Sequence, residues 1–150
     1  GASGAYSTSV PYGWSGTVIP DLPGYTFKPV TKDFSNVTTT QKQDFAATAI
    51  TFTISGKITT GGAGKIGVVV KGLPGDPITS LTGAYTATVP YNWSGMVTPV
   101  LAGYAFTPAV ITYANVMANQ TQNYEMAAAT FTIAGKVMLN GVALSVEDGI

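Results

Sequence analysis

The sequence predicts an all-β protein built from tandem antiparallel β-sandwich modules, and three observations lead to this prediction. A 79-residue unit repeats along the chain without a gap until the last dozen residues. Within the unit, several segments alternate between apolar and polar residues, as half-buried strands do. Eighteen glycines and nine prolines separate these segments, and no segment shows the apolar spacing of a helix.

The repeat is clearest in motifs that recur after 79 residues. The pattern Val-Pro-Tyr-x-Trp-Ser-Gly occurs twice, and so does the pattern Gly-Tyr-x-Phe-x-Pro. A period of this length suits a small β-sandwich and exceeds that of solenoid repeats. The matched segments are 10–16 with 89–95, 24–29 with 103–108, and 51–58 with 130–137.

The segment from Thr51 to Ile58 illustrates the predicted strands. Its even positions are Phe, Ile, Gly and Ile, whereas its odd positions are Thr, Thr, Ser and Lys. This period of two predicts a strand with one face in the core. The dipeptides Gly61-Gly62 and Asn140-Gly141 follow such segments and predict tight hairpin turns with positive φ.

The boundaries of the 79-residue repeat do not coincide with the two ends of the given sequence. The small-residue stretches 46–49 and 127–129 are interpreted as short linkers between modules. Residues 50–128 then form one complete module, residues 1–49 the later part of another, and residues 129–150 the start of a third. The two incomplete pieces are complementary, because together they omit only the equivalent of the loop 73–79.

Composition excludes several function classes. Seven lysines balance seven acidic residues and arginine is absent, whereas a nucleic-acid-binding face needs a basic surface. The chain also lacks histidine and cysteine, which removes the commonest general base, thiolate ligands and disulfides. No paired acidic motif recurs in both copies, and no apolar run reaches the length of a membrane helix. We therefore expect no enzyme activity, no metal or other cofactor, no nucleic-acid partner and no membrane insertion.

With these motifs in view, the repeat resembles the carboxypeptidase-regulatory-like and collagen-adhesin B-type group of prealbumin-like, Ig-like β-sandwiches. The resembling segments are Ile54 to Ile58, Val68 to Val70 and Thr82 to Pro90. The two recurring aromatic motifs resemble tandem repeats of large secreted bacterial surface proteins. The resemblance implies a seven-stranded type of sandwich, an extracellular or cell-surface location and no catalysis. It does not specify a ligand, because such modules serve many functions.

The paired aromatics Tyr12 with Trp14 and Tyr91 with Trp93 have two interpretations. Aromatic faces stack on sugar rings, so these residues are candidate ligand-stacking residues for surface glycans or other matrix proteins. They also serve as packing anchors at the end of a sandwich or at a joint between modules. Their recurrence in both copies favours packing.

A lysine recurs at one position of the repeat, and an acid or amide recurs at another. Such a pair could form an isopeptide crosslink. Lys57 and Lys136 recur on the opening strand, and Asp44 and Asn123 recur on the closing strand. In the adhesin modules that the repeat resembles, a buried lysine forms an isopeptide bond with such a partner. Alternation instead places Lys57 on the solvent face, which favours an exposed lysine that protects a sheet edge.

The incomplete ends predict assembly. A lone hairpin is marginal in water, and a sandwich without its opening strands leaves half a core exposed. We therefore expect the tail of one chain to complete the head of the next by strand complementation, which forms a head-to-tail extracellular filament or surface fibre. Two alternatives are an excerpt of a longer covalent adhesin or stalk and a carbohydrate-binding module. The predicted assembly residues are Phe131, Ile133, Val137, Val142, Leu144, Val10 and Phe45.

Overall fold

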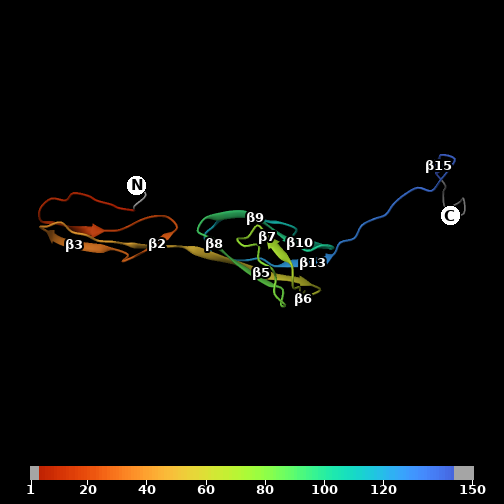
Figure 1. Cartoon of the computed structure of the whole chain (residues 1–150), viewed down its shortest axis with the longest axis horizontal. Helices are drawn as coiled ribbons and strands as arrows, with labels where there is room; N and C mark the ends of the chain where they lie inside the picture. Colours follow the sequence, from red (N-terminus) through yellow and green to blue (C-terminus); the bar gives the residue numbers. More distant parts are fainter. Residues whose placement is uncertain (1–3, 144–150) are drawn as a thin grey trace.

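The computed structural model describes residues 4–143, and all regular structure within them is β-strand, which confirms the all-β prediction. The chain is elongated (Figure 1), with a head of residues 4–49, a central unit of residues 50–128 and a tail of residues 129–143. The strands are β1 (Trp14–Val18), β2 (Tyr25–Lys28), β3 (Lys32–Val37), β4 (Ala46–Ala49), β5 (Thr51–Thr60), β6 (Ala63–Gly64), β7 (Val69–Lys71), β8 (Ala84–Pro90), β9 (Trp93–Val100), β10 (Tyr104–Thr107), β11 (Ile111–Val116), β12 (Gln120–Thr121), β13 (Tyr124–Ala128), β14 (Met138–Leu139) and β15 (Val142–Ala143).

The central unit consists of two sheets around one core, as in a β-sandwich. The larger sheet is built around β5, which pairs with β8 on one side and with β12 and β13 on the other; β13 also pairs with β10. The smaller sheet has the order β11-β9-β7. Side chains from both sheets form a single buried cluster of aliphatic and aromatic residues. The largest fully buried side chains are Tyr124, Ile54, Ile58, Val68, Val70, Val89 and Val97.

The larger sheet corrects the expectation of a purely antiparallel sandwich. β5 pairs antiparallel with β8 but runs parallel to β12 and β13. Parallel neighbours need a long crossover connection, and here nearly the whole central unit lies between β5 and its parallel partners. Alternation within single strands carries no information about the direction of a partner that lies about 66 residues away.

The head repeats the second half of the central unit with the same registers. Trp14 pairs with Val37 and Gly16 with Phe34, and the residues 79 positions later pair in the same way in β9 and β11. The register of β2 with β4 likewise matches that of β10 with β13. Even the bulge in the first pair recurs at the equivalent place. The head therefore repeats β9, β10, β11 and β13. It lacks the segments equivalent to β5, β6 and β7, and its segments equivalent to β8 and β12 are present but form no strand.

The stretches interpreted as linkers are in fact strands. Residues 46–49 form β4, which pairs with β2, and residues 127 and 128 belong to β13, which pairs with β10. Backbone hydrogen bonds do not depend on side-chain size, so alanine-rich segments join a sheet when a partner edge is available. As a result, only Ile50 separates β4 from β5.

The two predicted hairpin turns are present. Gly61 and Gly62 have φ of 57° and 83°, and Asn140 and Gly141 have φ of 50° and 83°. Positive φ at both central residues is the requirement of a type I′ turn. The β14–β15 hairpin has the register of the β5–β6 hairpin shifted by 79 residues, so the tail contains the start of a third copy.

Candidate assembly site: an open groove and an unpaired segment

β5 holds the central unit together because it lies between two other parts of the sheet. It pairs with β8 from Thr51 to Lys57, and its other edge faces β12 and β13. On that second edge, Asn119 and Asn123 accept hydrogen bonds through Oδ1 from the Thr53 and Lys57 amides, both at 2.9 Å. The Gln122 amide donates to the Ser55 carbonyl at 2.9 Å. Removing β5 would break all of these bonds at once.

β5 also supplies the centre of the core. Ile54 and Ile58 are completely buried, and Phe52 packs against the same cluster. The solvent face carries Lys57, as alternation predicted. At Gly56 the strand passes so close to the segment between β12 and β13 that an added Cβ would lie 1.7 Å from the Gln122 carbonyl oxygen. Glycine is therefore required there by the approach of the two backbones.

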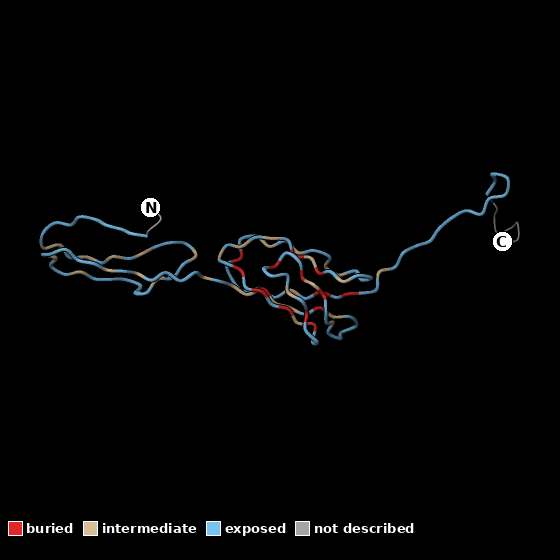
Figure 2. Tube along the Cα trace, in the orientation of Figure 1, coloured by how far each residue is buried: buried red, intermediate tan, exposed pale blue. Residues whose placement is uncertain are grey.

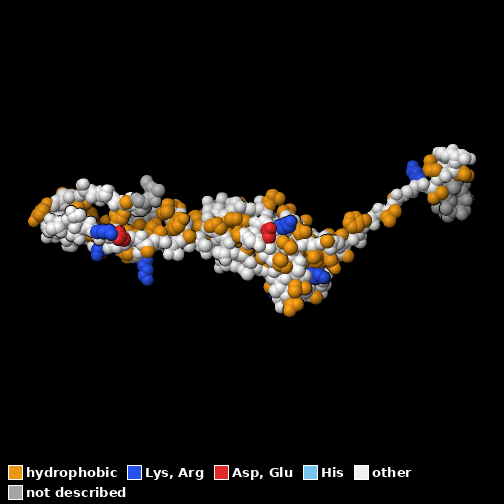
Figure 3. All heavy atoms as spheres, in the orientation of Figure 1, with side chains coloured by type: hydrophobic (Ala, Val, Ile, Leu, Met, Phe, Trp, Pro, Cys, Tyr) orange, Lys and Arg blue, Asp and Glu red, His pale blue; other side chains and the backbone are white. Residues whose placement is uncertain are grey.

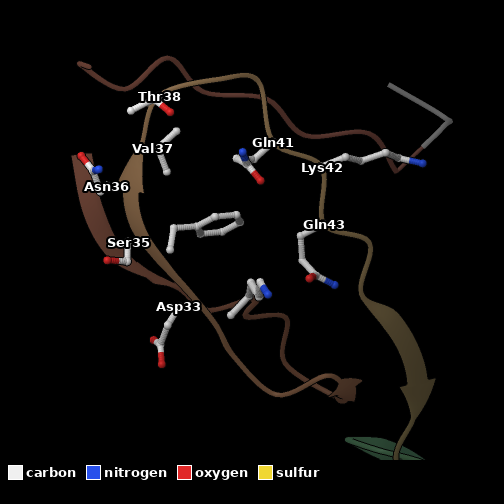
Figure 4. A pocket seen from close by; sticks show the side chains of 10 residues that line it. Asp33, Ser35, Asn36, Val37, Thr38, Gln41, Lys42 and Gln43 are labelled. Atoms are coloured by element: carbon white, nitrogen blue, oxygen red, sulfur yellow. The ribbon is translucent and has the colours of Figure 1, made fainter. Parts of the chain in front are cut away.

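The head has an open groove where its own copy of β5 would lie. The segment 4–11 is the equivalent of the region around β8, and the segment 38–45 is the equivalent of the region around β12 and β13. Both segments line a groove of about 1340 Å³ whose lining is mostly apolar. A smaller hollow of about 300 Å³ lies beside β3 (Figure 4), where Val37 and Gln41 project into the space between β3 and the segment that follows it.

Core positions of the repeat are consequently uncovered in the head. No residue from 4 to 49 is buried, and buried residues are confined to the central unit (Figure 2). Tyr85 is 4% exposed, whereas its equivalent Tyr6 is 57% exposed. Yet the local contacts are already formed: the Tyr6 hydroxyl donates to the Gln43 carbonyl at 2.6 Å, as Tyr85 does to Gln122 at 2.7 Å. One side-chain contact of the central unit is thus already present beside the groove.

The tail contains the segment equivalent to β5, exposed and without strand structure. Residues 130–137 have the sequence pattern of β5, but no strand among the described residues pairs with them, and they extend away from the central unit (Figure 1). Ile133 is 101% exposed and Phe131 is 90% exposed, although the equivalent Ile54 is fully buried. Figure 3 shows apolar side chains along this extended segment and across the head.

The predicted assembly residues fall into these two features. Val10 and Phe45 line the groove of the head, and Phe45 contacts Tyr6 with ring centroids 6.1 Å apart. The others that can be placed are exposed on the tail: Phe131, Ile133, Val137 and Val142. Leu144 lies outside the described residues. Tyr6 and Gln43, which also line the groove, were not among the residues predicted from the sequence. Their recurrence as Tyr85 and Gln122 could have identified them.

The paired aromatics lie in different environments. Trp14 and Trp93 lie over Gly16 and Gly95 of their own strands and are partly buried. Trp93 packs against the core and Tyr113. Tyr91 packs at the junction of head and central unit, whereas Tyr12 is 86% exposed at the rim of the groove.

Charges are few, and the perturbed groups are tyrosines. Burial raises the pKa of Tyr124 to about 12 and also raises the pKa of Tyr85 and of Tyr113. An exposed ion pair joins Lys42 and Asp44 at 3.0 Å.

Within residues 4–143, no three His, Cys, Asp or Glu side chains gather as a metal site requires. No helix in the same residues has the length and apolarity to span a membrane.

The chain matches no protein-family model, no curated protein and no solved structure. Its function is therefore inferred from the groove, the exposed segment 130–137 and the repeat that relates them.

Proposed function

We propose that the chain is a structural subunit of an extracellular filament or surface fibre, assembled head to tail by strand complementation between Ig-like modules. One observation carries the proposal. The same repeat position is fully buried at Ile54 and fully exposed at Ile133, while the head has an open groove at the corresponding place. The extracellular location rests on the resemblance of the motifs to secreted surface repeats.

The proposed contact has a defined register. β5 and β8 pair so that residue numbers of partners total 141, as for Phe52 with Val89. In the proposed contact, the residue of β5 is replaced by the tail residue 79 positions later, and the residue of β8 by the head residue 79 positions earlier. The total therefore stays at 141. Phe131 of one chain would then pair with Val10 of the next, and Ile133 with Thr8. The tail side chains equivalent to the buried side chains of β5 would then point into the groove of the head.

The physical driving force is burial of apolar surface. Each Phe, Ile or Val side chain taken out of water contributes about 1.5–3 kcal/mol, so Phe131, Ile133 and Val137 together favour docking by roughly 5 kcal/mol or more. Ordering the tail opposes this gain, because residues 130–137 have no regular secondary structure in the single chain and become a strand only on docking.

Intermolecular contact fits the geometry better than closure within one chain. The head and the tail lie at opposite ends of the molecule, with the central unit between them (Figure 1). A head-to-tail contact of this kind does not close on itself and produces an open chain of subunits. The alternative is a covalent tandem array, in which neighbouring modules of one longer polypeptide supply the same strands.

A cysteine pair tests the proposal, because the chain has no native cysteine. The Thr53 amide points away from β8 toward Asn119, so Thr53 and Thr88 form a non-hydrogen-bonded pair, the closer kind in an antiparallel sheet. Their equivalents across the proposed contact are Thr132 and Ser9. The double variant Thr132→Cys with Ser9→Cys should give a ladder of disulfide-linked multimers on a non-reducing gel.

A matched variant distinguishes this register from random contact. Thr132→Cys with Ser7→Cys displaces one cysteine by two residues on the same face and should crosslink much less. Sedimentation velocity of the unmodified chain should show a concentration-dependent series of oligomers. A chain that stays monomeric, or a double variant that yields only an internally crosslinked monomer, would overturn the proposal.

A further inference from the structure

The junction between the head and the central unit is a single residue held from both sides. The Ile50 amide donates to the Gly24 carbonyl of the head at 2.8 Å, and the Ile50 carbonyl accepts from the Tyr91 amide of the central unit at 3.0 Å. Because β4 ends at Ala49 and β5 begins at Thr51, no flexible linker is available. The two hydrogen bonds therefore restrict the angle between the two units.

Tyr91 adds a side-chain contact across the same junction. An added Cβ at Gly24 would lie 3.2 Å from Tyr91 Cδ1, so the ring lies against the backbone of the head. The ring is also flanked by Phe52, with centroids 6.5 Å apart, and its hydroxyl lies 3.9 Å from the Met117 sulfur. Gly24 has a φ of 86°, and its lack of a side chain permits this close contact.

The far end of the central unit carries half of the same junction. The Ala129 amide donates to the Gly103 carbonyl at 2.9 Å, which repeats the bond from Ile50 to Gly24. In contrast to Gly24, an added Cβ at Gly103 would meet no atom within 4 Å among the described residues. Phe131, the equivalent of Phe52, is also exposed. The aromatic ring that covers this place in the first junction is missing from the second.

The head presents the missing ring at its outer end. Tyr12 is the equivalent of Tyr91 and is 86% exposed. Its position is prepared by the neighbouring backbone, because the Gly13 amide donates to the Val37 carbonyl at 2.9 Å, as the Asn92 amide does to Val116. A large exposed aromatic residue and an uncovered glycine therefore lie at opposite ends of one chain.

We infer that Tyr12 of one copy packs over Gly103 of the preceding copy, beside Phe131, while its amide donates to the Ala129 carbonyl. This inference rests on the proposed head-to-tail assembly and adds a second contact surface outside the strand pairing. It makes the junction between chains equivalent to the junction within a chain. The filament is then a rod in which every unit, whether formed within one chain or between two, is held to the next at the same angle.

Three variants test the role of Tyr12, each combined with the Thr132→Cys and Ser9→Cys pair. Tyr12→Ala should still give the disulfide ladder, because the strand pairing remains. Its filaments in electron micrographs should bend more, with a persistence length reduced by about half or more, since modules without a holding contact move relative to one another. Tyr12→Phe keeps the ring and should leave the persistence length unchanged. Tyr91→Ala should soften the junction within the chain to a similar extent.

The outcomes separate this inference from the proposed function. A normal ladder with Tyr12→Ala filaments as stiff as those of the parent protein would overturn the contact with Gly103 and leave strand complementation intact. A Thr132→Cys and Ser9→Cys variant without further changes that gives no ladder would overturn both. Softening by Tyr12→Ala and Tyr91→Ala, but not by Tyr12→Phe, is the expected result.

Discussion

Thr59 and Glu125 are paired across the parallel edge of β5 and β13, and the Thr59 hydroxyl donates to Glu125 Oε2 at 2.5 Å. The other oxygen of the carboxylate accepts from the Gly61 amide at 2.6 Å, so Glu125 also holds the hairpin turn. The equivalent pair in the proposed contact between chains is Met138 with Ala46. A polar pair within the central unit thus corresponds to an apolar pair between chains, which favours docking of the tail in the head rather than in the central unit of another chain.

We predict that Ala46→Glu weakens assembly. By the same equivalence the new carboxylate would accept from the Asn140 amide but would face Met138 in place of the Thr59 hydroxyl. One oxygen would lose water without gaining a partner, so the association constant should fall about tenfold, which corresponds to about 1.4 kcal/mol. Adding Met138→Thr should restore much of it by recreating the Thr59–Glu125 pair. Sedimentation velocity over a concentration series measures both effects. Thr48→Glu is the control, because it adds the same charge to the same face of β4, and an equal loss there would refute the pairing.

We predict opposite effects of one substitution at two repeat positions. Gly56→Ala should destabilise the central unit, because its Cβ would collide with the Gln122 carbonyl. An added Cβ at Gly135 meets no atom within 4 Å in the described residues, so Gly135→Ala should leave the melting temperature of the isolated chain unchanged. In the filament, however, the tail must pass the Gln43 carbonyl in the same way. Combined with the Thr132→Cys and Ser9→Cys pair, Gly135→Ala should therefore abolish the disulfide ladder. An unchanged ladder would contradict the docking register.

Isoleucine truncation should show the same separation between folding and assembly. Ile54→Ala removes a fully buried side chain and should lower the free energy of unfolding of the central unit by about 3 kcal/mol. Ile133→Ala should leave that free energy unchanged in a dilute monomer and should weaken oligomer formation. Urea denaturation followed by tryptophan fluorescence measures the first effect, and sedimentation measures the second. Loss of monomer stability in Ile133→Ala would show that the tail packs on its own chain.

The buried tyrosines predict a loss of stability in alkali. Burial disfavours the phenolate, so the pKa of Tyr124 in the folded protein, about 12, lies above its unfolded value of about 10. The corresponding stability is fully present below about pH 10 and is lost as the pH rises from 10 to 12. Urea midpoints from pH 8 to pH 12 measure this. The Tyr124 hydroxyl has no hydrogen-bond partner in the described residues, so Tyr124→Phe should match the parent at pH 8 and decline less above pH 10.

Much of the local structure could be predicted from residues in the chain. Alternation from Phe52 to Ile58 identified the buried face of β5 correctly, and Asn140-Gly141 identified a hairpin turn. The matching registers of the β1–β3 and β9–β11 pairs also followed from the repeat. Prediction was wrong where backbone pairing mattered more than side chains, because the alanine-rich stretches 46–49 and 127–129 contribute to strands and not to linkers.

The sequence by itself determined the repeat, the faces of its strands and the turns between them, because these depend on residues that are neighbours along the chain. Only the tertiary structure decided that β5 runs parallel to β12 and β13, that Ile50 alone joins two units, and that identical motifs are buried at Ile54 and exposed at Ile133. The physical reason is that burial and strand direction depend on which segment lies alongside. In the head and the tail, that neighbouring segment is missing from the described chain.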